Sequence, residues 1–308
     1  MRIHHLDCGP MRPPGGALMD GVSTGIFGRL TCHCLAVETG ADGVVLVDTG
    51  LGMRDMLRPY PRLPAPNAAL LRFRHDPDRT MLRQLKRLGI SPRDVRHIVM
   101  THMDFDHAGG LVDFPEARVH LMEAEAVAAR RRQGLLGRLR YRPAQWGDTS
   151  RWHVYPERAG GRWFGFDAVV QLDNLPPEFL LVPLPGHSAG HAGVAIETPR
   201  GWVLHAGDTY FNRAEVHAPD PSGAPAGVAA YERLMAWNAR LGYANQARVR
   251  ALVQDATAPV AVFCTHDPVE FVAMSVWSGR GGDTGAAEAE ARTEDGAAGD
   301  AVGAAGSW

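Results

Sequence analysis

His and Asp residues follow five short apolar runs of this chain, at 44–47, 97–100, 179–184, 202–204 and 260–263. The side chains that come after these runs are Asp48, His102, Asp104, Asp106, His107, His187, Asp208 and His266. Short runs rich in Val, Ile and Leu are typical of buried strands. Because ligand sites in α/β proteins lie beyond the carboxyl ends of strands, the pattern predicts one convergent metal centre.

The densest part of this pattern is the hexapeptide from His102 to His107. Imidazole nitrogen and carboxylate oxygen are ligands for Zn, Mn or Fe. Residues two apart in an extended segment point the same way, so His102 and Asp104 can serve one ion. Asp106 and His107 come after the bend and can face a second ion. The remaining ligands are then expected from His187, Asp208 and His266.

Composition narrows the class of protein. The 308 residues suit one large α/β domain, and 32 basic against 34 acidic residues give no overall charge for nucleic acid or a membrane surface. The four cysteines have neither zinc-ribbon spacing nor the number expected of a disulfide framework. We see no apolar signal core at the N-terminus and no run near the ~18 apolar residues of a membrane span, so we expect a cytoplasmic protein.

The pattern along the chain predicts strands at 32–38 and 44–48, a Pro- and Arg-rich loop over 52–79, and helices at 80–88, 123–132, 231–241 and 244–254. Beyond residue 278 Gly, Ala, Glu and Asp dominate. A segment of that composition cannot bury enough apolar surface to offset its ordering entropy. We therefore predict a single domain over 1–277 and a disordered tail over 278–308.

With these motifs in order, the chain resembles the metallo-β-lactamase fold superfamily, in its acyl-homoserine-lactonase-like branch. The motifs are Asp48 in Leu-Val-Asp-Thr-Gly, the 102–107 cluster followed by Ala-Gly-Gly, then His187, Asp208 and His266. The resemblance covers about residues 30 to 270. It implies an α/β fold, a four-layer αβ/βα sandwich with a dimetal site at one edge of two facing sheets.

The resemblance also implies roles for single residues. His102, Asp104 and His187 would hold metal 1; Asp106, His107 and His266 would hold metal 2; and Asp208 would bridge the two ions. Asp106 and Asp208 are the residues that we expect to act directly in catalysis. Asp48 and His191 would support the ligands from behind. The cofactor expected is a pair of divalent ions, Zn first, with Mn or Fe at the Asp104 site.

Two positions depart from the family pattern. The second motif of the family is usually H-x-H-x-D-H, and this chain has Asp104 at the third position. Carboxylate oxygen is a harder ligand than imidazole, which favours Mn or Fe at metal 1; the alternative is that this site has decayed and only metal 2 binds. The catalytic Tyr of the lactonases falls at Phe211, and the preceding Tyr210 should face away on an extended backbone.

Two further regions have open interpretations. The aromatic residues at 146–166 can form a satellite core or the wall of a pocket for an apolar acyl group. The arginines between 130 and 142 are more typical of a solvated helix face, although they could meet an anionic substrate.

We therefore expect a hydrolase that opens a lactone or another carboxylic ester with a hydroxide shared by two metal ions. A thioesterase of the glyoxalase II type or a phosphodiesterase could use the same centre. The partner expected is a small-molecule ester or lactone, with no nucleic acid and no membrane. The sequence leaves the acyl group, the native metal and the oligomeric state open.

Overall fold

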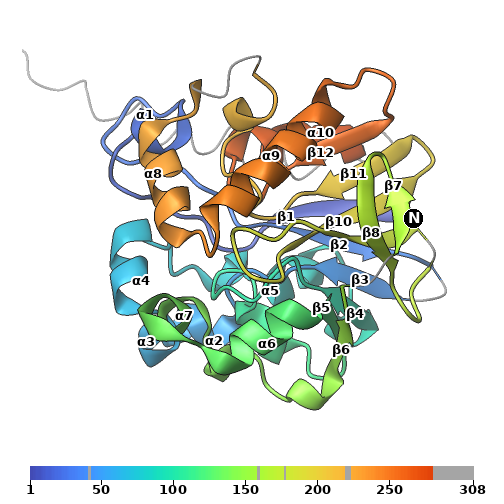
Figure 1. Ribbon diagram of the computed structural model, residues 1–308. Coiled ribbons are helices and arrows are strands. Elements are labelled where there is room, and N and C mark those ends of the chain that lie inside the picture. Colours follow the sequence, from blue (N-terminus) through green and yellow to red (C-terminus); the bar gives the residue numbers. More distant parts are fainter. Residues whose placement is uncertain (41–42, 158–159, 177, 219–222, 280–308) are drawn as a thin grey trace, which may run out of the picture.

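The computed structural model describes residues 1–40, 43–157, 160–176, 178–218 and 223–279. Two mixed sheets of six strands each face one another, with helices on their outer sides (Figure 1). This is the α/β architecture predicted from the sequence.

The first sheet has its strands in sequence order, β1 to β6. Antiparallel pairing joins β1 to β2 and β2 to β3, and parallel pairing joins β3 to β4, β4 to β5 and β5 to β6. The strands are β1 (Arg2–Asp7), β2 (His33–Glu38), β3 (Val44–Val47), β4 (Val95–Val99), β5 (Arg118–Met122) and β6 (Trp152–Tyr155). Because β3 and β4 run parallel, the residues after them leave the sheet at the same edge.

The second sheet has the order β12-β11-β10-β9-β8-β7. Only β11 and β12 are parallel there, and the other neighbours pair antiparallel. Its strands are β7 (Gly161–Trp163), β8 (Phe166–Gln171), β9 (Phe179–Pro183), β10 (Ala192–Thr198), β11 (Gly201–His205) and β12 (Val260–Phe263).

The alternation of side chains along the strands builds three apolar layers. In β2, Leu35 and Val37 pack between the two sheets, whereas Cys34 and Ala36 pack on the opposite face, toward the helices. In β10, Val194 faces the space between the sheets and Ala195 faces outward. Strands buried on both faces read as continuous apolar runs, which is why these segments lack polar alternation.

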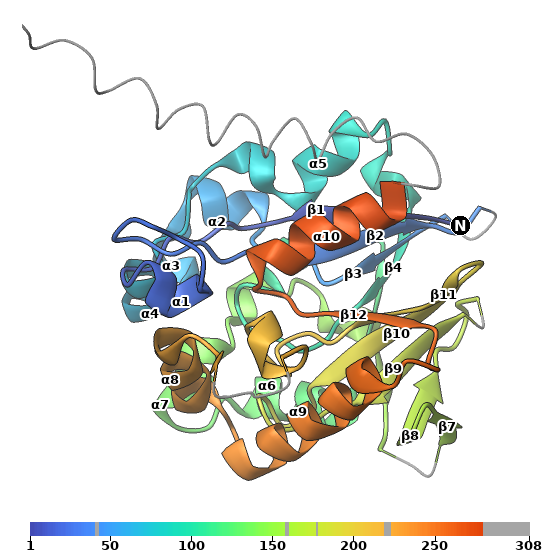
Figure 2. The ribbon, with the colours of Figure 1, turned by 90° about the horizontal axis from the view of Figure 1, so that it is seen from above.

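Helices cover both outer faces. Figure 2 shows α5 on the side of the first sheet, α9 on the side of the second, and α10 along the edge between β1 and β12. The helices are α1 (Ala17–Asp20), α2 (Met53–Leu57), α3 (Pro59–Arg62), α4 (Ala65–Leu71), α5 (Met81–Arg87), α6 (Glu123–Arg131), α7 (Gly134–Arg140), α8 (Ala226–Met235), α9 (Ala239–Gln254) and α10 (Pro268–Gly279). The sandwich therefore has four layers.

The prediction of a loop over 52–79 was wrong, because α2, α3 and α4 lie there. Proline is tolerated in the first turn of a helix, where its missing N–H has no partner to lose. Pro59 opens α3 and Pro66 lies in the first turn of α4. Leu71 of α4 is buried against the N-terminal segment in a cluster with Met11 and Phe105, so these helices close one end of the sandwich.

Two other boundaries differ from the prediction. The break between α8 and α9 falls at residues 236–238, where the Asn238 side chain accepts a hydrogen bond from the Leu241 N–H and caps α9. Helix α10 continues to Gly279, two residues into the predicted tail, and Ser278 Oγ lies 2.8 Å from His5 Nε2. The rest of that tail, 280–308, lies outside the described residues.

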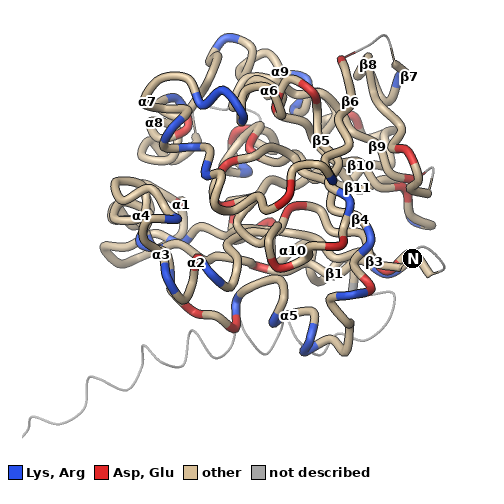
Figure 3. The backbone as a smooth tube through the Cα atoms, turned by 90° about the horizontal axis from the view of Figure 1, so that it is seen from below, with Lys and Arg blue, Asp and Glu red and all other residues tan. Residues whose placement is uncertain are grey.

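Within the described part of the chain, no helix is both long and apolar enough to cross a membrane. Lys and Arg are interspersed with Asp and Glu along the backbone (Figure 3).

Candidate metal centre

The His and Asp residues that follow the strands meet at one end of the sandwich. Thr101 and His102 come after β4, His187 comes after β9, and Asp208 and His266 come after β11 and β12. Each of these residues is at most 5% exposed. Both sheets thus contribute to one buried cluster.

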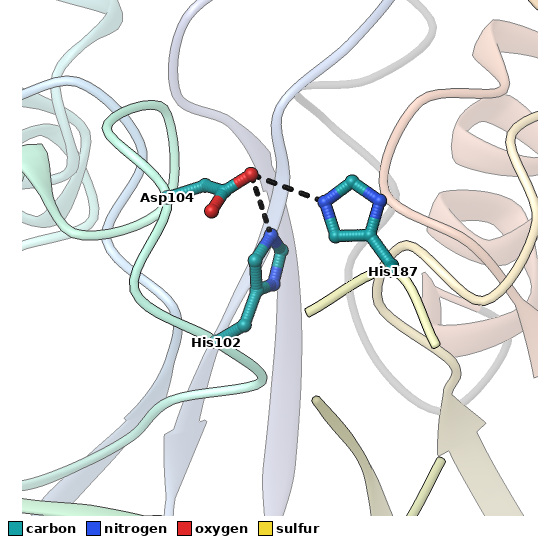
Figure 4. Close-up of side chains that lie close together, drawn as sticks. All are labelled: His102, Asp104 and His187. Atoms are coloured by element: carbon teal, nitrogen blue, oxygen red, sulfur yellow. Dashed lines mark hydrogen bonds and ion pairs between the residues drawn. The ribbon is translucent and has the colours of Figure 1, made fainter. Parts of the chain in front are cut away.

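The first group of ligand atoms is formed by His102, Asp104 and His187 (Figure 4). Asp104 Oδ2 lies 3.5 Å from His102 Nε2 and 3.1 Å from His187 Nε2. The potential ligand atoms all lie within 4.8 Å of one another, which is close enough for one ion to bind between them.

The second group is formed by Asp106, His107 and His266. His266 Nε2 lies 3.9 Å from Asp106 Oδ2. Asp208 stands between the two groups: its Oδ2 is 3.2 Å from His266 Nε2 and 3.5 Å from His187 Nε2, and its Oδ1 is 3.3 Å from His107 Nε2. This is the position that a bridging carboxylate requires.

Several of these atoms have no hydrogen-bond partner among the described residues, although they are fully buried. They are His102 Nε2, Asp104 Oδ1, His107 Nε2 and Asp208 Oδ1. Buried polar atoms in proteins are nearly always hydrogen-bonded, so an inward-facing set without partners needs an explanation. A set of imidazole nitrogens and carboxylate oxygens fits two divalent ions.

The charges in the cluster stabilise one another. Burial alone would raise the pKa of Asp208, yet His266, His107 and His187 hold it well below its usual value. Burial alone would lower the pKa of His107, yet Asp208 and Asp48 raise it well above its usual value. Asp208 therefore stays ionised in the protein interior, as a metal ligand must.

Asp48 holds the end of β4 and one histidine of the second group. Its Oδ2 lies 2.9 Å from His107 Nδ1 and accepts from the Thr101 hydroxyl at 2.7 Å, while Oδ1 accepts from the Thr101 N–H at 2.8 Å. Asp48 has a positive φ of 54°, which is uncommon for a residue with a side chain. Its carboxylate contacts both His107 and Thr101, as expected for a supporting residue.

His191 supports the backbone of Asp208. Its Nδ1 lies 3.1 Å from the Leu184 carbonyl oxygen, which can only accept, so Nδ1 carries the proton. Nε2 is then free to accept from the Asp208 N–H at 2.8 Å. Among the described residues, no carboxylate oxygen is hydrogen-bonded to the His191 ring. Both ring nitrogens contact backbone atoms, which suits the supporting role expected from the sequence.

Glu125 is a buried support that sequence reasoning missed. It lies in α6, accepts from the Met103 N–H at 2.9 Å, and accepts from the Ser188 hydroxyl at 2.6 Å and the Gly190 N–H at 3.0 Å. It therefore connects the 102–107 segment of the first sheet with the loop that carries His187. No motif signals this role, because the contacts are long-range in the sequence.

Arg140, at the end of α7, was expected on a solvated helix face, and that expectation was wrong. The residue is 2% exposed, and its Nη1 lies 3.1 Å from Asp104 Oδ2. Burial alone would lower the pKa of Arg140, but Asp104 and other nearby acidic groups raise it. A buried cation therefore stands beside the one ligand that departs from the family motif.

Tyr210 points away from the centre, as its place in the sequence indicates. It is fully buried, and its hydroxyl donates to Glu270 at 3.0 Å. Phe211 takes the side facing the cluster, with ring centroids 4.8 Å from His266 and 5.7 Å from His187. A different phenol, Tyr231 of α8, reaches the cavity beside the ligands.

A cavity opens onto the cluster. Asp104, Asp106, His187, Asp208 and His266 form its polar part, and the remaining wall is apolar: Met11, Leu30, Leu71, Phe105, Phe211, Tyr231 and Met235. The aromatic residues at 146–166 take no part in this wall. Trp146 and Trp152 pack against the first sheet, and Trp163 and Phe166 pack on the outer face of the second, so they belong to the core.

The chain belongs to the metallo-beta-lactamase superfamily, whose family model matches residues 27–266. It is 39% identical over 272 residues to a probable metallo-hydrolase of Mycobacterium tuberculosis, covering 87% of this chain and 81% of the relative. It is 28% identical over 210 residues to an N-acyl homoserine lactonase of Bacillus cereus, covering 65% of this chain and 75% of the relative.

Solved structures share the fold. An N-acyl homoserine lactone hydrolase with the product N-hexanoyl-L-homoserine at its catalytic metal centre matches with a TM-score of 0.61 and 20% identity, covering 87% of this chain and 94% of the other. A probable metal-dependent hydrolase from Staphylococcus aureus matches with a TM-score of 0.63 and 19% identity, covering 86% and 88%. The chain is a metallo-hydrolase of this superfamily.

Proposed function

We propose that this protein is a dimetal hydrolase that opens a lactone or another carboxylic ester. The observation that carries the proposal is a set of buried ligand atoms that faces inward from both sheets and has no hydrogen-bond partner in the described part of the chain. We assign His102, Asp104 and His187 to one ion and Asp106, His107 and His266 to the other. Asp208 lies between them, within 3.7 Å of a nitrogen from each group.

When bound, two divalent ions supply Lewis acidity, which acidifies water and polarises an ester carbonyl. The chain supplies the rest. Asp208 and Asp106 present carboxylate oxygens at the floor of the cavity, where they can accept the proton of the attacking water. Asp48 and His191 hold His107 and the Asp208 backbone in place. No Ser or Cys nucleophile is needed.

The apolar wall of the cavity supports an ester with an apolar part. Met11, Leu30, Leu71 and Phe211 place apolar side chains beside the polar floor, which favours a substrate with an acyl or aryl group there. Lactonases among the relatives and structural neighbours point to a lactone as the first substrate class to test. We expect Zn first, with Mn or Fe as the alternative at the Asp104 site, because carboxylate oxygen is the harder ligand.

The test combines metal analysis with a substrate panel. The purified protein should bind close to two ions per chain after reconstitution with Zn, Mn or Fe, and it should hydrolyse lactones or carboxylic esters faster than thioesters or phosphodiesters. Chelation should abolish activity and lower the melting temperature, because a ligand of the native state adds stability by mass action. Absence of bound metal under all three reconstitutions contradicts the proposal.

A preference within the panel refines or overturns the substrate class. Fastest turnover of thioesters would identify a thioesterase on the same centre, and fastest turnover of phosphodiesters would identify a phosphodiesterase. In either case the metal assignment survives and the ester assignment fails.

A further inference from the structure

Arg140 is a buried cation in direct contact with a candidate metal ligand. Its side chain is 3% exposed and that of Asp104 is 5% exposed. Nη1 lies 3.1 Å from Asp104 Oδ2, and Nη2 donates to the Met235 carbonyl oxygen. Burying a charge costs free energy unless the charge is paired. A buried cation beside a site for metal cations therefore needs a physical explanation.

The position of Arg140 argues against direct contact with a substrate. The cavity wall is formed by Asp104 and Met235 but not by Arg140 itself. The guanidinium contacts Asp104 Oδ2, the oxygen that also lies 3.5 Å from His102 Nε2 and 3.1 Å from His187 Nε2. One carboxylate oxygen, Oδ2, is shared by the Arg and the two imidazoles, and the other, Oδ1, has no hydrogen-bond partner among the described residues.

The positive charge of Arg140 offsets the extra negative charge that Asp104 brings to the centre. Asp104, Asp106 and Asp208 contribute three negative charges to the centre, whereas a neutral imidazole at position 104 would leave two. The guanidinium of Arg140 adds one positive charge in contact with the extra carboxylate. The pair Asp104–Arg140 therefore carries the same net charge as a single neutral ligand at that position.

We propose that Arg140 is a positioning residue for the metal 1 group: it offsets the charge of Asp104 and fixes the direction of its carboxylate. This inference rests on the dimetal function proposed above. It implies that the two residues work as a unit, so that changing either alone unbalances the centre and changing both restores it. Asp104→His alone would leave Arg140 buried against an incoming cation with no anion between them.

A double-mutant cycle tests the coupling. The four proteins are the wild type, Asp104→His, Arg140→Gln and the double variant Asp104→His/Arg140→Gln. The first readout is the affinity of the metal 1 group for its ion, which we expect to be the second metal equivalent to bind; it is measured by competition with a chelator. The second readout is the melting temperature of the metal-free protein. Loss of the Arg140 contact to the Met235 carbonyl occurs in both backgrounds, so it cancels from the coupling term.

Asp104→His alone should lower the affinity for the second metal equivalent by about tenfold or more, because an unpaired buried cation then repels the metal ion. The double variant should return to within about threefold of the wild type, because contacting residues couple. Arg140→Gln alone should lower the metal-free melting temperature, and the double variant should recover part of that loss. Arg140→Lys, which keeps the charge, should stay near the wild type if its fold is intact.

Arg138→Gln is the matched control, because Arg138 is exposed on the same helix. It should show no coupling to Asp104→His. Independent effects, with the double variant as weak as the product of the two single variants, overturn the inference while leaving the dimetal function intact. A wild type that binds no metal overturns the proposed function, and this inference with it.

Discussion

The two ligand groups of the centre are held in different ways. In the second group, His107 Nδ1 meets the Asp48 carboxylate at 2.9 Å and His266 Nδ1 meets the Thr31 carbonyl oxygen at 2.7 Å. In the first group, His102 Nδ1 meets only the Thr101 hydroxyl at 3.0 Å, and His187 Nδ1 has no hydrogen-bond partner among the described residues.

This difference bears on how ready each group is for an ion. An acceptor on Nδ1 fixes the tautomer that leaves Nε2 free to ligate, and it also fixes the direction of the ring. Both histidines of the second group have a carboxylate or carbonyl acceptor, whereas in the first group His102 has only the neutral Thr101 hydroxyl and His187 Nδ1 has no partner among the described residues. We therefore expect the second group to bind its ion first and more tightly.

The largest expected effect comes from removing one carboxylate from each group. Asp106→Ala should remove the tighter ion, and Asp104→Ala should remove the weaker one while metal 2 stays. Activity should fall by orders of magnitude in both, because each ion contributes to the same chemistry. Metal content by elemental analysis, beside the turnover of the best ester substrate, checks this.

The decayed-site alternative predicts a different result for the same proteins. It requires one ion in the wild type and little change in Asp104→Ala. Since Asp104→Ala also leaves Arg140 without its carboxylate, Asp104→Ala/Arg140→Gln serves as the folding control.

A smaller effect is expected from the support behind the second group. Asp48→Asn keeps the shape of the side chain, and Asn tolerates the positive φ of this position well. It removes the charge that His107 faces, and loss of such a support typically costs about 10- to 100-fold in metal affinity. The affinity of the first metal equivalent should fall accordingly. An effect confined to the second equivalent would reverse the ranking of the two groups.

The sequence indicated the second group more completely than the first. Every ligand that we assign follows a strand, and strand ends can be read from apolar runs, so the cluster from His102 to His107 and its partners His187, Asp208 and His266 could be predicted. Asp48 could be predicted too, because its motif is local. These residues do lie together in the structure.

The supports of the first group could not be predicted in the same way. Arg140 and Glu125 reach the centre from α7 and α6, and whether an Arg near a helix end is solvated or buried depends on packing against distant segments. Met235, which receives the Arg140 hydrogen bond, lies 95 residues away. Sequence patterns also favoured a loop over 52–79, since proline content alone does not distinguish a loop from a helix start.

Two phenols near the centre offer a finer comparison. Tyr231 lines the cavity, and its hydroxyl lies 3.4 Å from Asn67 Nδ2, whereas Tyr210 is fully buried against Glu270. Tyr231→Phe should change kcat or KM several-fold and leave the melting temperature nearly unchanged. Tyr210→Phe should leave kinetics unchanged and cost about 1 kcal/mol of stability, the typical net value of a hydrogen bond. The reverse outcome would move the functional phenol to Tyr210.

The smallest effect is expected at the C-terminal end, where two truncations separate the contribution of α10 from that of residues 280–308. Ending the chain after Gly279 removes only residues without a core-forming pattern, so melting temperature and hydrolysis should match the full chain.

Ending the chain after Val276 also removes Trp277, which packs against the core between the sheets and carries the Arg200 guanidinium 4.0 Å above its ring. It removes the Ser278 hydroxyl beside His5 as well. This second truncation should lower the melting temperature by several degrees, as expected for a loss of about 1–2 kcal/mol in a domain of this size. The metal content of both proteins should stay unchanged, because none of the ligands that we assign lies in α10. A fall in melting temperature after the first truncation would show that residues beyond 279 contribute to the fold.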